Sequence, residues 1–377
     1  MKIGIITIHN SPSYGASLQA FALWKYITDC GHECEIIDLH RPHQKDFVTS
    51  KKYLAYRNDN VSIKTKIKKL IMGLLGKGRC KYLTKEAQEK FDSFNSQIRL
   101  SRPFLGVDEL YSDPPVYDVY ITGSDQLWNP AQHFCIEPYF LTFAPKGKKK
   151  ISYASSIGIT ELTAKEKELF KSSLLKYDAI SVRELQAKRL LQNLTGMEIT
   201  QVADPTFLLP IETWKSISVK PNLSEKYLLL FTLSFNKQLL DYSIKLGNQS
   251  GLSVVYLTAI QPQNEGTYMA VTDAGPLEWI GYIANAEMVI TDSFHGTVFS
   301  IITGVNNFFT YISPGNQRGS RITDLLDTFG LSHHLLNTDL HQTYCELSSF
   351  NLNHKHVSEI IQKERERSRI FLTKYLS

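Results

Sequence analysis

The side chains with the clearest potential for chemistry lie in residues 292–297, whose sequence is Asp-Ser-Phe-His-Gly-Thr. This segment follows a short apolar run and precedes an apolar pattern with helical spacing, so we expect it to end a strand and begin a helix. The positive end of a helix dipole attracts anions and favours a neutral imidazole. We predict that His295 is an acid/base catalyst, and that Ser293, Gly296 and Thr297 bind an anionic group. The alternative is a structural histidine.

A second polar group, Gly-Ser-Asp-Gln-Leu-Trp-Asn at 123–129, follows the apolar run 116–122. Asp125 is suited to remove a proton from a substrate hydroxyl, and Ser124 and Gln126 are suited to hydrogen-bond the same substrate. We therefore predict that Asp125 is catalytic and that Ser124 and Gln126 bind a substrate with hydroxyl groups. The alternative for Asp125 is a helix N-cap.

Three arginines are candidates for binding the anion. Arg183 directly follows the apolar run 179–182, and its planar guanidinium matches a phosphate or a carboxylate. Arg318 and Arg321 lie in a polar segment before a short helical pattern, and either can reach a bound anion from there. The alternatives are a structural ion pair for Arg183 and solvated loop positions for the other two.

The loop at residues 9–16 also leads from an apolar run into a helical pattern. Gly15 permits close approach of the backbone to a ligand, and the helix start offers free N–H groups. We predict that Asn10, Tyr14 and Gly15 contact a ligand, with an ordinary strand-to-helix turn as the alternative.

The chain has none of the motifs that indicate a metal ion or a phosphate-binding loop. It contains no Asp-x-Asp, no Cys/His set with zinc spacing, no Walker A sequence and no Gly-x-Ser-x-Gly. We therefore predict no metal ion and no cofactor. Five cysteines without a Cys-x-x-Cys pair, and no apolar run of 18 residues, indicate a reduced cytoplasmic protein without a membrane span.

Strands and helices that alternate along the whole chain position these polar segments, and such alternation is typical of α/β folds with parallel sheets. The length of 377 residues and a proline-rich stretch between 204 and 224 favour two domains. We predict two doubly wound Rossmann-like domains, one at 1–210 and one at 211–345. Residues 346–377 are expected to form a helix that packs back on the first domain. The active site is expected in the interdomain cleft, beyond the carboxyl ends of the strands.

Residues 62–90 have a helical apolar pattern flanked by lysines, which predicts a basic helical insertion. Its part at 62–81 is suited to a peripheral contact with the inner membrane surface. The alternative is a helix that packs on its own domain and exposes a solvated lysine face. The net charge of +5 fits an anionic ligand, but it is too small for a dedicated nucleic-acid-binding protein.

Six motifs, in this order and spacing, resemble the polysaccharide pyruvyl transferase family and together cover about residues 3–330. They are Tyr14-Gly15-Ala16 with Leu18-Gln19-Ala20, Gly123-Ser124-Asp125-Gln126-Leu127-Trp128-Asn129, Ser152-Tyr153-Ala154-Ser155, Ser181-Val182-Arg183-Glu184, Asp204-Pro205-Thr206 and Asp292-Ser293-Phe294-His295-Gly296-Thr297. The resemblance implies a glycosyltransferase-B-like (GT-B-like) fold of two Rossmann domains. It also implies that His295 is the acid/base and that Arg183 helps to bind the donor. The domain at 1–210 is then the acceptor side and the domain at 211–345 the donor side, and the acceptor is bound by Asn10, Tyr14, Gly15, Ser124 and Gln126.

Members of this family transfer the pyruvyl group of phosphoenolpyruvate to sugar hydroxyls without a metal ion. The resemblance therefore implies a pyruvate ketal on a bacterial capsule or exopolysaccharide precursor, with a sugar acceptor that is lipid-linked or nucleotide-linked. Phosphoenolpyruvate is a co-substrate in this reaction, so no cofactor is implied.

The chain departs from the family at one position that affects donor binding. Many members have Arg-Leu-His where this chain has Ser293-Phe294-His295, so it resembles an Asp-Ser-Phe-His-Gly branch of the family. Either Arg318 or Arg321 then supplies the missing charge, or the donor differs. Two other functions remain open: a metal-independent glycosyltransferase with a nucleotide-sugar donor, and a non-catalytic glycan-binding or assembly protein.

Overall fold

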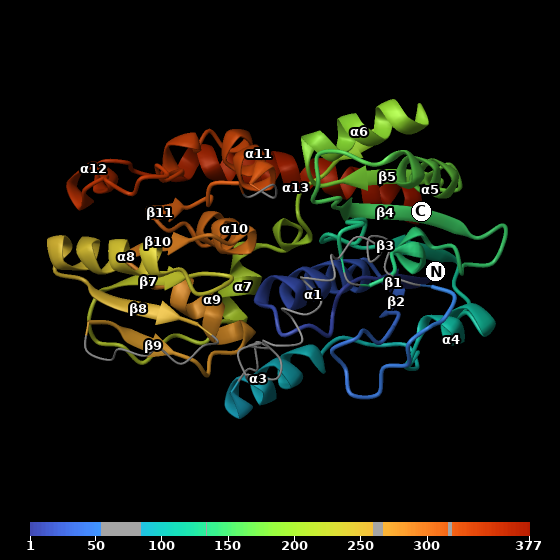
Figure 1. The fold of residues 1–377 in the computed structure, drawn as a ribbon, viewed down its shortest axis with the longest axis horizontal. Helices are drawn as coiled ribbons and strands as arrows, with labels where there is room; N and C mark the ends of the chain where they lie inside the picture. Colours follow the sequence, from blue (N-terminus) through green and yellow to red (C-terminus); the bar gives the residue numbers. More distant parts are fainter. Residues whose placement is uncertain (54–83, 133, 259–266, 316–318) are drawn as a thin grey trace, which may run out of the picture.

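The computed structural model describes residues 1–53, 84–132, 134–258, 267–315 and 319–377. Its strands form two all-parallel sheets with helices packed on their faces, and the two sheets lie side by side in Figure 1. The predicted α/β fold with two parallel sheets is therefore confirmed.

The first sheet has six strands in the order β2-β1-β3-β4-β5-β6. Strands β3 and β5 are buried along their whole length, because helices cover both faces of a parallel sheet. This double burial explains why the strands are continuous apolar runs in the sequence. The six strands are β1 (Lys2–Ile6), β2 (Glu33–Ile36), β3 (Val119–Thr122), β4 (Lys149–Ser155), β5 (Ala179–Val182) and β6 (Ile199–Gln201).

The second sheet has five strands in the order β11-β10-β7-β8-β9. Strand β10 pairs in parallel with both β7 and β11, so it is not an outer strand of the sheet. The residues that follow β10 therefore lie between those that follow its two neighbours. The five strands are β7 (Tyr227–Phe231), β8 (Ser253–Leu257), β9 (Met269–Val271), β10 (Met288–Thr291) and β11 (Asn307–Thr310).

The helices begin and end at residues with the expected capping chemistry. Thr163 and Glu166 form a capping box at the start of α5, and Gly251 ends α8 with a φ of 72°. The α-helices are α1 (Tyr14–Asp29), α3 (Lys85–Asn95), α4 (Val107–Ser112), α5 (Ala164–Leu174), α6 (Leu185–Thr195), α7 (Ile211–Ile217), α8 (Lys237–Ser250), α9 (Pro276–Ala284), α10 (Phe294–Thr303), α11 (Ser320–Thr328), α12 (Tyr344–Ser348) and α13 (His354–Leu376). Short 3₁₀ helices are η2 (Glu137–Phe140), η3 (Pro205–Phe207) and η4 (Ser332–His334).

The two sheets are joined by direct packing of helices from each side. Helix α1, which follows β1, contacts both α9 and α10 from the second sheet. At this junction the ring of Tyr14 stacks on Trp279 with ring centroids 5.4 Å apart, and Tyr14 Oη donates a hydrogen bond to the carbonyl oxygen of Ala274 at 3.0 Å. One apolar cluster therefore includes residues from both sides of the junction.

The last helix, α13, makes hydrogen bonds to the first sheet and its connections. The Ala203 amide donates to Ser368 Oγ at 3.0 Å, and Lys149 Nζ donates to the Tyr375 carbonyl at 3.0 Å. Figure 1 shows the C-terminus beside β4. The boundaries proposed for the two domains stay a prediction.

The predicted basic helix at 62–81 lies outside the described residues, as does most of the insertion at 62–90. The part that the structure describes, α3, buries Ala87, Phe91 and Phe94 on one face, as an amphipathic helix of a globular domain does. Among the described residues, no helix combines the length and apolarity needed to span a membrane.

Candidate active site

Residues 292–297 form the turn from β10 into α10. Ser293 is the N-cap of α10, and its Oγ accepts a hydrogen bond from the Gly296 amide at 3.2 Å. The first amides of an α-helix have no acceptor within the helix, and this cap satisfies only one of them. The amides of Phe294 and His295 belong to the same turn, so the start of α10 can still bind an anion.

Two predicted anion ligands in this turn have structural contacts instead. Gly296 lets α10 approach β10, because a Cβ atom there would lie 2.5 Å from Thr291 Oγ1. Thr297 is fully buried, and its hydroxyl contacts the Ser293 carbonyl at 3.1 Å and the Thr310 hydroxyl at 2.7 Å. The Thr297 hydroxyl is therefore directed into the domain, and its contact with the ligand stays a prediction.

His295 lies in the wall of a cleft of about 90 Å³, which we call the His295 cleft. It is lined by residues 12–15 around the start of α1, residues 231–235 at the end of β7, residues 257–258 at the end of β8, and Ser293 and His295. The cleft therefore forms where the carboxyl ends of strands from both sheets meet, which is the place predicted for ligand binding.

The imidazole of His295 is held between two neighbours and is only 9% exposed. Its Nε2 lies 3.5 Å from Asp204 Oδ2 and is buried without another hydrogen-bond partner among the described residues. Its Nδ1 faces Gly15, where an added Cβ would lie 2.0 Å away. Sequence and structure therefore agree on the position of His295 at the helix start, and the structure adds the contact with Asp204.

Asp204 is a buried carboxylate that connects several of these side chains. Its Oδ1 accepts hydrogen bonds from the Thr206 amide at 3.1 Å and from Thr206 Oγ1 at 2.8 Å, and its Oδ2 accepts one from Arg183 Nη1 at 2.7 Å. Burial by itself would raise the pKa of Asp204, but His295, Arg183 and the Thr206 amide together hold that pKa well below its usual range. Asp204 is therefore ionised at neutral pH.

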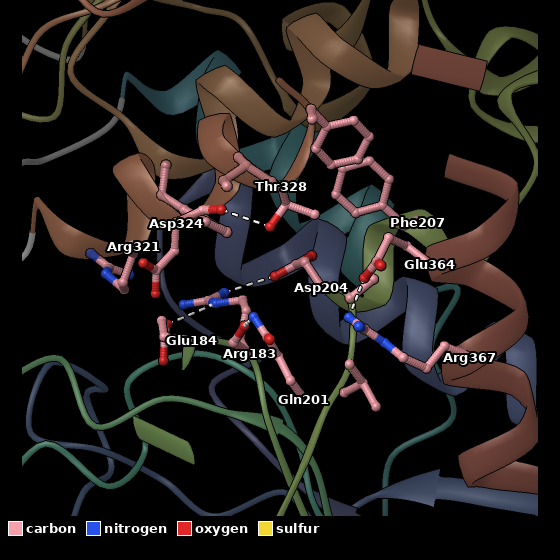
Figure 2. A pocket seen from close by; sticks show the side chains of 15 residues that line it. Arg183, Glu184, Gln201, Asp204, Phe207, Arg321, Asp324, Thr328, Glu364 and Arg367 are labelled. Carbon is pink, nitrogen blue, oxygen red and sulfur yellow. Dashed lines mark hydrogen bonds and ion pairs between the residues drawn. The ribbon is translucent and has the colours of Figure 1, made fainter. Parts of the chain in front are cut away.

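Arg183 is also buried, and two carboxylates already pair with it. Its Nη1 contacts Asp204, its Nε donates to Glu184 Oε1 at 3.1 Å, and its guanidinium lies 4.2 Å from the centre of the Phe294 ring. Burial would lower the pKa of Arg183, but the charges of Glu184 and Asp204 outweigh this and raise it. Figure 2 shows the contacts of Arg183 with Glu184 and Asp204 beside a second cavity of about 40 Å³, the Arg183 cavity. These contacts favour the structural ion pair that the sequence left open.

Arg321 is also close to Phe294, with its guanidinium 5.6 Å from the centre of that ring, and it lines the Arg183 cavity (Figure 2). With the Gln126 amide oriented so that its oxygen faces Arg321, that oxygen accepts bonds from Nη1 at 3.1 Å and Nη2 at 2.9 Å. The structure thus connects two predicted site residues, one from each sheet. Arg318 lies outside the described residues.

The predicted residues at 123–129 are not among the described residues that line the His295 cleft. Ser124 is buried, and its Oγ is 3.5 Å from both Asp204 Oδ2 and Arg183 Nη1. Asp125 adopts a left-handed φ of 77°, and its Oδ1 accepts a bond from the Gln126 amide at 2.8 Å. Such a backbone conformation is unfavourable for a non-glycine residue, so the surrounding structure must impose it.

Two further predicted acceptor contacts differ in their surroundings. Tyr14 lines the His295 cleft, but its hydroxyl donates to Ala274, and burial, with smaller effects of Glu278 and Asp273, raises its pKa. It can therefore shape the cleft but not act as a base. The Asn10 side chain donates to Gln44 Oε1 at 2.7 Å, apart from the described lining of the cleft.

The close contact between Gly15 and His295 gives a testable prediction. In Gly15→Ala, the new methyl group must displace the imidazole or move α1 away from α10, because the ideal Cβ position lies 2.0 Å from Nδ1. Since small displacements of catalytic groups have large effects on rate, we expect turnover to fall about 10²-fold. The measurement is the steady-state rate of whichever transfer reaction the wild-type chain catalyses.

A double variant shows whether the clash itself is responsible. His295→Ala removes the ring that the methyl group meets, so adding Gly15→Ala to it should lower the melting temperature less than Gly15→Ala does alone. Equal effects in both backgrounds, or wild-type turnover in Gly15→Ala, would show that the contact is unimportant.

Within the described ranges, no three His, Cys, Asp or Glu side chains are grouped so that they can hold a metal ion. The residue that the sequence predictions missed is Asp204. Its signal was its place three residues after the end of β6, in the motif Asp204-Pro205-Thr206, although nothing in the sequence connects it with His295.

Comparisons with known proteins first concern the fold. The chain is similar to UDP-GlcNAc 2-epimerase from Methanocaldococcus jannaschii, with a TM-score of 0.51, 13% identity and coverage of 100% of both chains. It is also similar to UDP-N-acetylglucosamine 2-epimerase from Rickettsia bellii, with a TM-score of 0.51, 11% identity and coverage of 100% of this chain and 97% of the other. These structures support the GT-B-like arrangement of two Rossmann-like domains.

No curated protein matches the chain. A family model, that of the polysaccharide pyruvyl transferases, matches residues 14–314. This match includes both sheets from α1 onward and the turn that carries His295. The chain therefore belongs to the polysaccharide pyruvyl transferase family.

Proposed function

We propose that this chain transfers the pyruvyl group of phosphoenolpyruvate to two hydroxyls of a sugar in a polysaccharide precursor, which forms a cyclic ketal. The observation that carries this proposal is the position of His295 in the wall of the His295 cleft, at a helix start and in contact with the ionised Asp204. Family membership supports a transferase that acts on glycans.

The start of α10 is the proposed site for the anionic donor. The amides of Phe294 and His295 and the Ser293 hydroxyl would bind its phosphate or carboxylate, and the helix dipole would favour the negative charge. Arg321 would add a positive charge from the neighbouring Arg183 cavity. Many family members have arginine at the position of Ser293. Because this chain lacks that positive charge, the backbone amides at the start of α10 contribute more to donor binding.

The reaction then needs proton transfer in both directions. Protonation of the donor's methylene carbon produces an oxocarbenium-like centre, and a sugar hydroxyl attacks this centre as a base removes its proton. The bond to phosphate then breaks, and a second hydroxyl attacks to close the ketal. Of the two hydroxyl protons, one ends on the new methyl group and the other on the released phosphate. His295 is the proposed acid/base, and Asp125 is a candidate second base.

We place this reaction in the cytoplasm. The described cysteines Cys30, Cys34, Cys135 and Cys345 are free thiols, as is usual in a reducing compartment. The sugar acceptor would be linked to a nucleotide or a lipid, and the second case would bring the protein to the inner membrane surface.

The test is to incubate the full chain with phosphoenolpyruvate and a panel of nucleotide-linked and lipid-linked sugars. We expect phosphate release that requires both substrates, and a product that carries a pyruvate ketal in its mass spectrum. Phosphoenolpyruvate should also raise the melting temperature. Stabilisation by UDP- or GDP-sugars but not by phosphoenolpyruvate, with no phosphate release, would instead identify a glycosyltransferase.

A further inference from the structure

We infer that Asp204 is a positioning residue that holds His295 in the tautomer with its proton on Nε2, and that Nδ1 is therefore the nitrogen that exchanges a proton with the substrate. The inference concerns which atom of the imidazole reacts and which buried group selects it. Its catalytic part rests on the proposed transfer reaction, whereas the tautomer itself can be measured without turnover.

The first step is the surroundings of Nε2. This atom is buried, and the polar atom that faces it is Asp204 Oδ2 at 3.5 Å. A carboxylate oxygen can only accept a hydrogen bond when ionised, so an unprotonated Nε2 would bring two lone pairs together. Placing the proton on Nε2 satisfies the buried atom and leaves Nδ1 as the basic nitrogen of the neutral ring.

The second step is the rigidity of Asp204. Thr206 holds Oδ1 through its amide and hydroxyl, and Arg183 holds Oδ2 at 2.7 Å. With both oxygens fixed, the carboxylate cannot turn away from His295. Its separation from Nε2 exceeds that of a well-formed hydrogen bond, and such contacts in unliganded sites often shorten when a ligand binds.

The third step is the position of Nδ1. It lies beside Gly15 in the lining of the His295 cleft, on the opposite edge of the ring from the contact with Asp204. As Nδ1 takes a proton from the substrate, the ring becomes an imidazolium, and the fixed negative charge of Asp204 stabilises it. The Arg183–Asp204–His295 chain thus performs the orienting role that a buried carboxylate has in a catalytic triad.

A second buried histidine provides an internal control with the opposite tautomer. His334 Nδ1 faces the carbonyl oxygen of Phe308 at 2.6 Å, so Nδ1 must be the donor. Burial lowers the pKa of His334 to about 4, so this ring is neutral at pH 7 and Nε2 carries no proton. His295 and His334 should therefore show opposite ¹⁵N patterns in one sample.

The experiment is two-bond ¹H–¹⁵N correlation spectroscopy on full-length protein labelled with ¹⁵N-histidine, with His295→Gln and His334→Gln used for assignment. We expect an unprotonated Nδ1 for His295 and an unprotonated Nε2 for His334. In Asp204→Asn the His295 population should shift toward the Nδ1–H form, while His334 remains unchanged. Finding His295 as the Nδ1–H tautomer in the wild-type chain would overturn the inference.

Kinetics separate this inference from the proposed reaction. In Asp204→Asn, kcat should fall about 10²–10⁴-fold, because the carboxylate charge is lost and His295 adopts the wrong tautomer. The KM for phosphoenolpyruvate should change less than about threefold. Thr206→Val keeps the charge but removes the hydroxyl bond to Oδ1, so a smaller loss of about tenfold is expected, and this variant serves if Asp204→Asn does not fold.

The two possible failures give different results. If the tautomers are as expected but phosphoenolpyruvate supports no turnover, the positioning of His295 by Asp204 stands and the proposed donor is wrong. If turnover occurs and Asp204→Asn changes neither the tautomer nor kcat, the proposed function stands and the positioning is wrong.

Discussion

Replacing His295 by glutamine should reduce phosphate release from phosphoenolpyruvate about 10²–10⁴-fold, because loss of a general acid/base typically has an effect of this size. Glutamine approximates the volume of the ring and can still donate a hydrogen bond toward Asp204, but it cannot carry the proton. The buried Asp204 should therefore keep a polar neighbour. The measurement is steady-state phosphate release with saturating acceptor, compared with the wild-type chain.

His354→Gln is the matched control. His354 lies at the exposed start of α13, where its Nε2 contacts Asn306 Oδ1, so the same substitution there should leave turnover unchanged. Melting temperatures of both variants show whether each one is folded. Near-wild-type turnover in a folded His295→Gln variant would remove His295 from the mechanism, whichever donor the chain uses.

The sequence was most informative where one physical requirement determines the pattern. Strand β10 had to be a continuous apolar run because both faces of its sheet are covered, and Ser293 and Gly296 mark the start of α10 through a cap and a close approach. These local requirements are sufficient to place His295 at a helix start on the sheet edge from the order of the residues alone.

The contacts of the site could not be predicted in the same way, because they join residues that are distant in the chain. Asp204 meets His295 only because η3 and α10 come together at the junction of the two sheets, and no periodicity encodes that contact. Thr297 illustrates the reverse case, since its place one turn into α10 puts its hydroxyl against Thr310 of the neighbouring strand rather than in the cleft.

The role of Arg183 could not be predicted from the sequence for the same reason. Its position after β5 fits an anion-binding residue as well as it fits a structural one. Which role applies depends on Glu184 and Asp204, which are both within hydrogen-bond distance of its guanidinium. Two buried carboxylate partners offset the charge of the guanidinium, although its Nη2 has no hydrogen-bond partner among the described residues. Its contribution to folding should then exceed its contribution to donor binding.

Arg183→Met should accordingly lower the free energy of unfolding by about 3–5 kcal/mol, since removing one partner of a buried ion pair leaves uncompensated buried charge on the other. Arg183 is 6% exposed and Asp204 is 2% exposed, so little solvent screening reduces this effect. The measurement is urea denaturation, with Arg189→Met as the control because that arginine is exposed on the neighbouring helix α6.

Combining Arg183→Met with Asp204→Asn distinguishes the two roles. If the arginine mainly neutralises buried carboxylates, removing the charge of Asp204 should recover part of the lost stability, so the double variant should lose less than the sum of the two single losses. A ligand-binding arginine predicts the opposite pattern, in which Arg183→Met remains nearly as stable as the wild-type chain but phosphoenolpyruvate no longer raises its melting temperature. That result would show that Arg183 binds the donor. It would also mean that Asp204 stays ionised without the charge of Arg183.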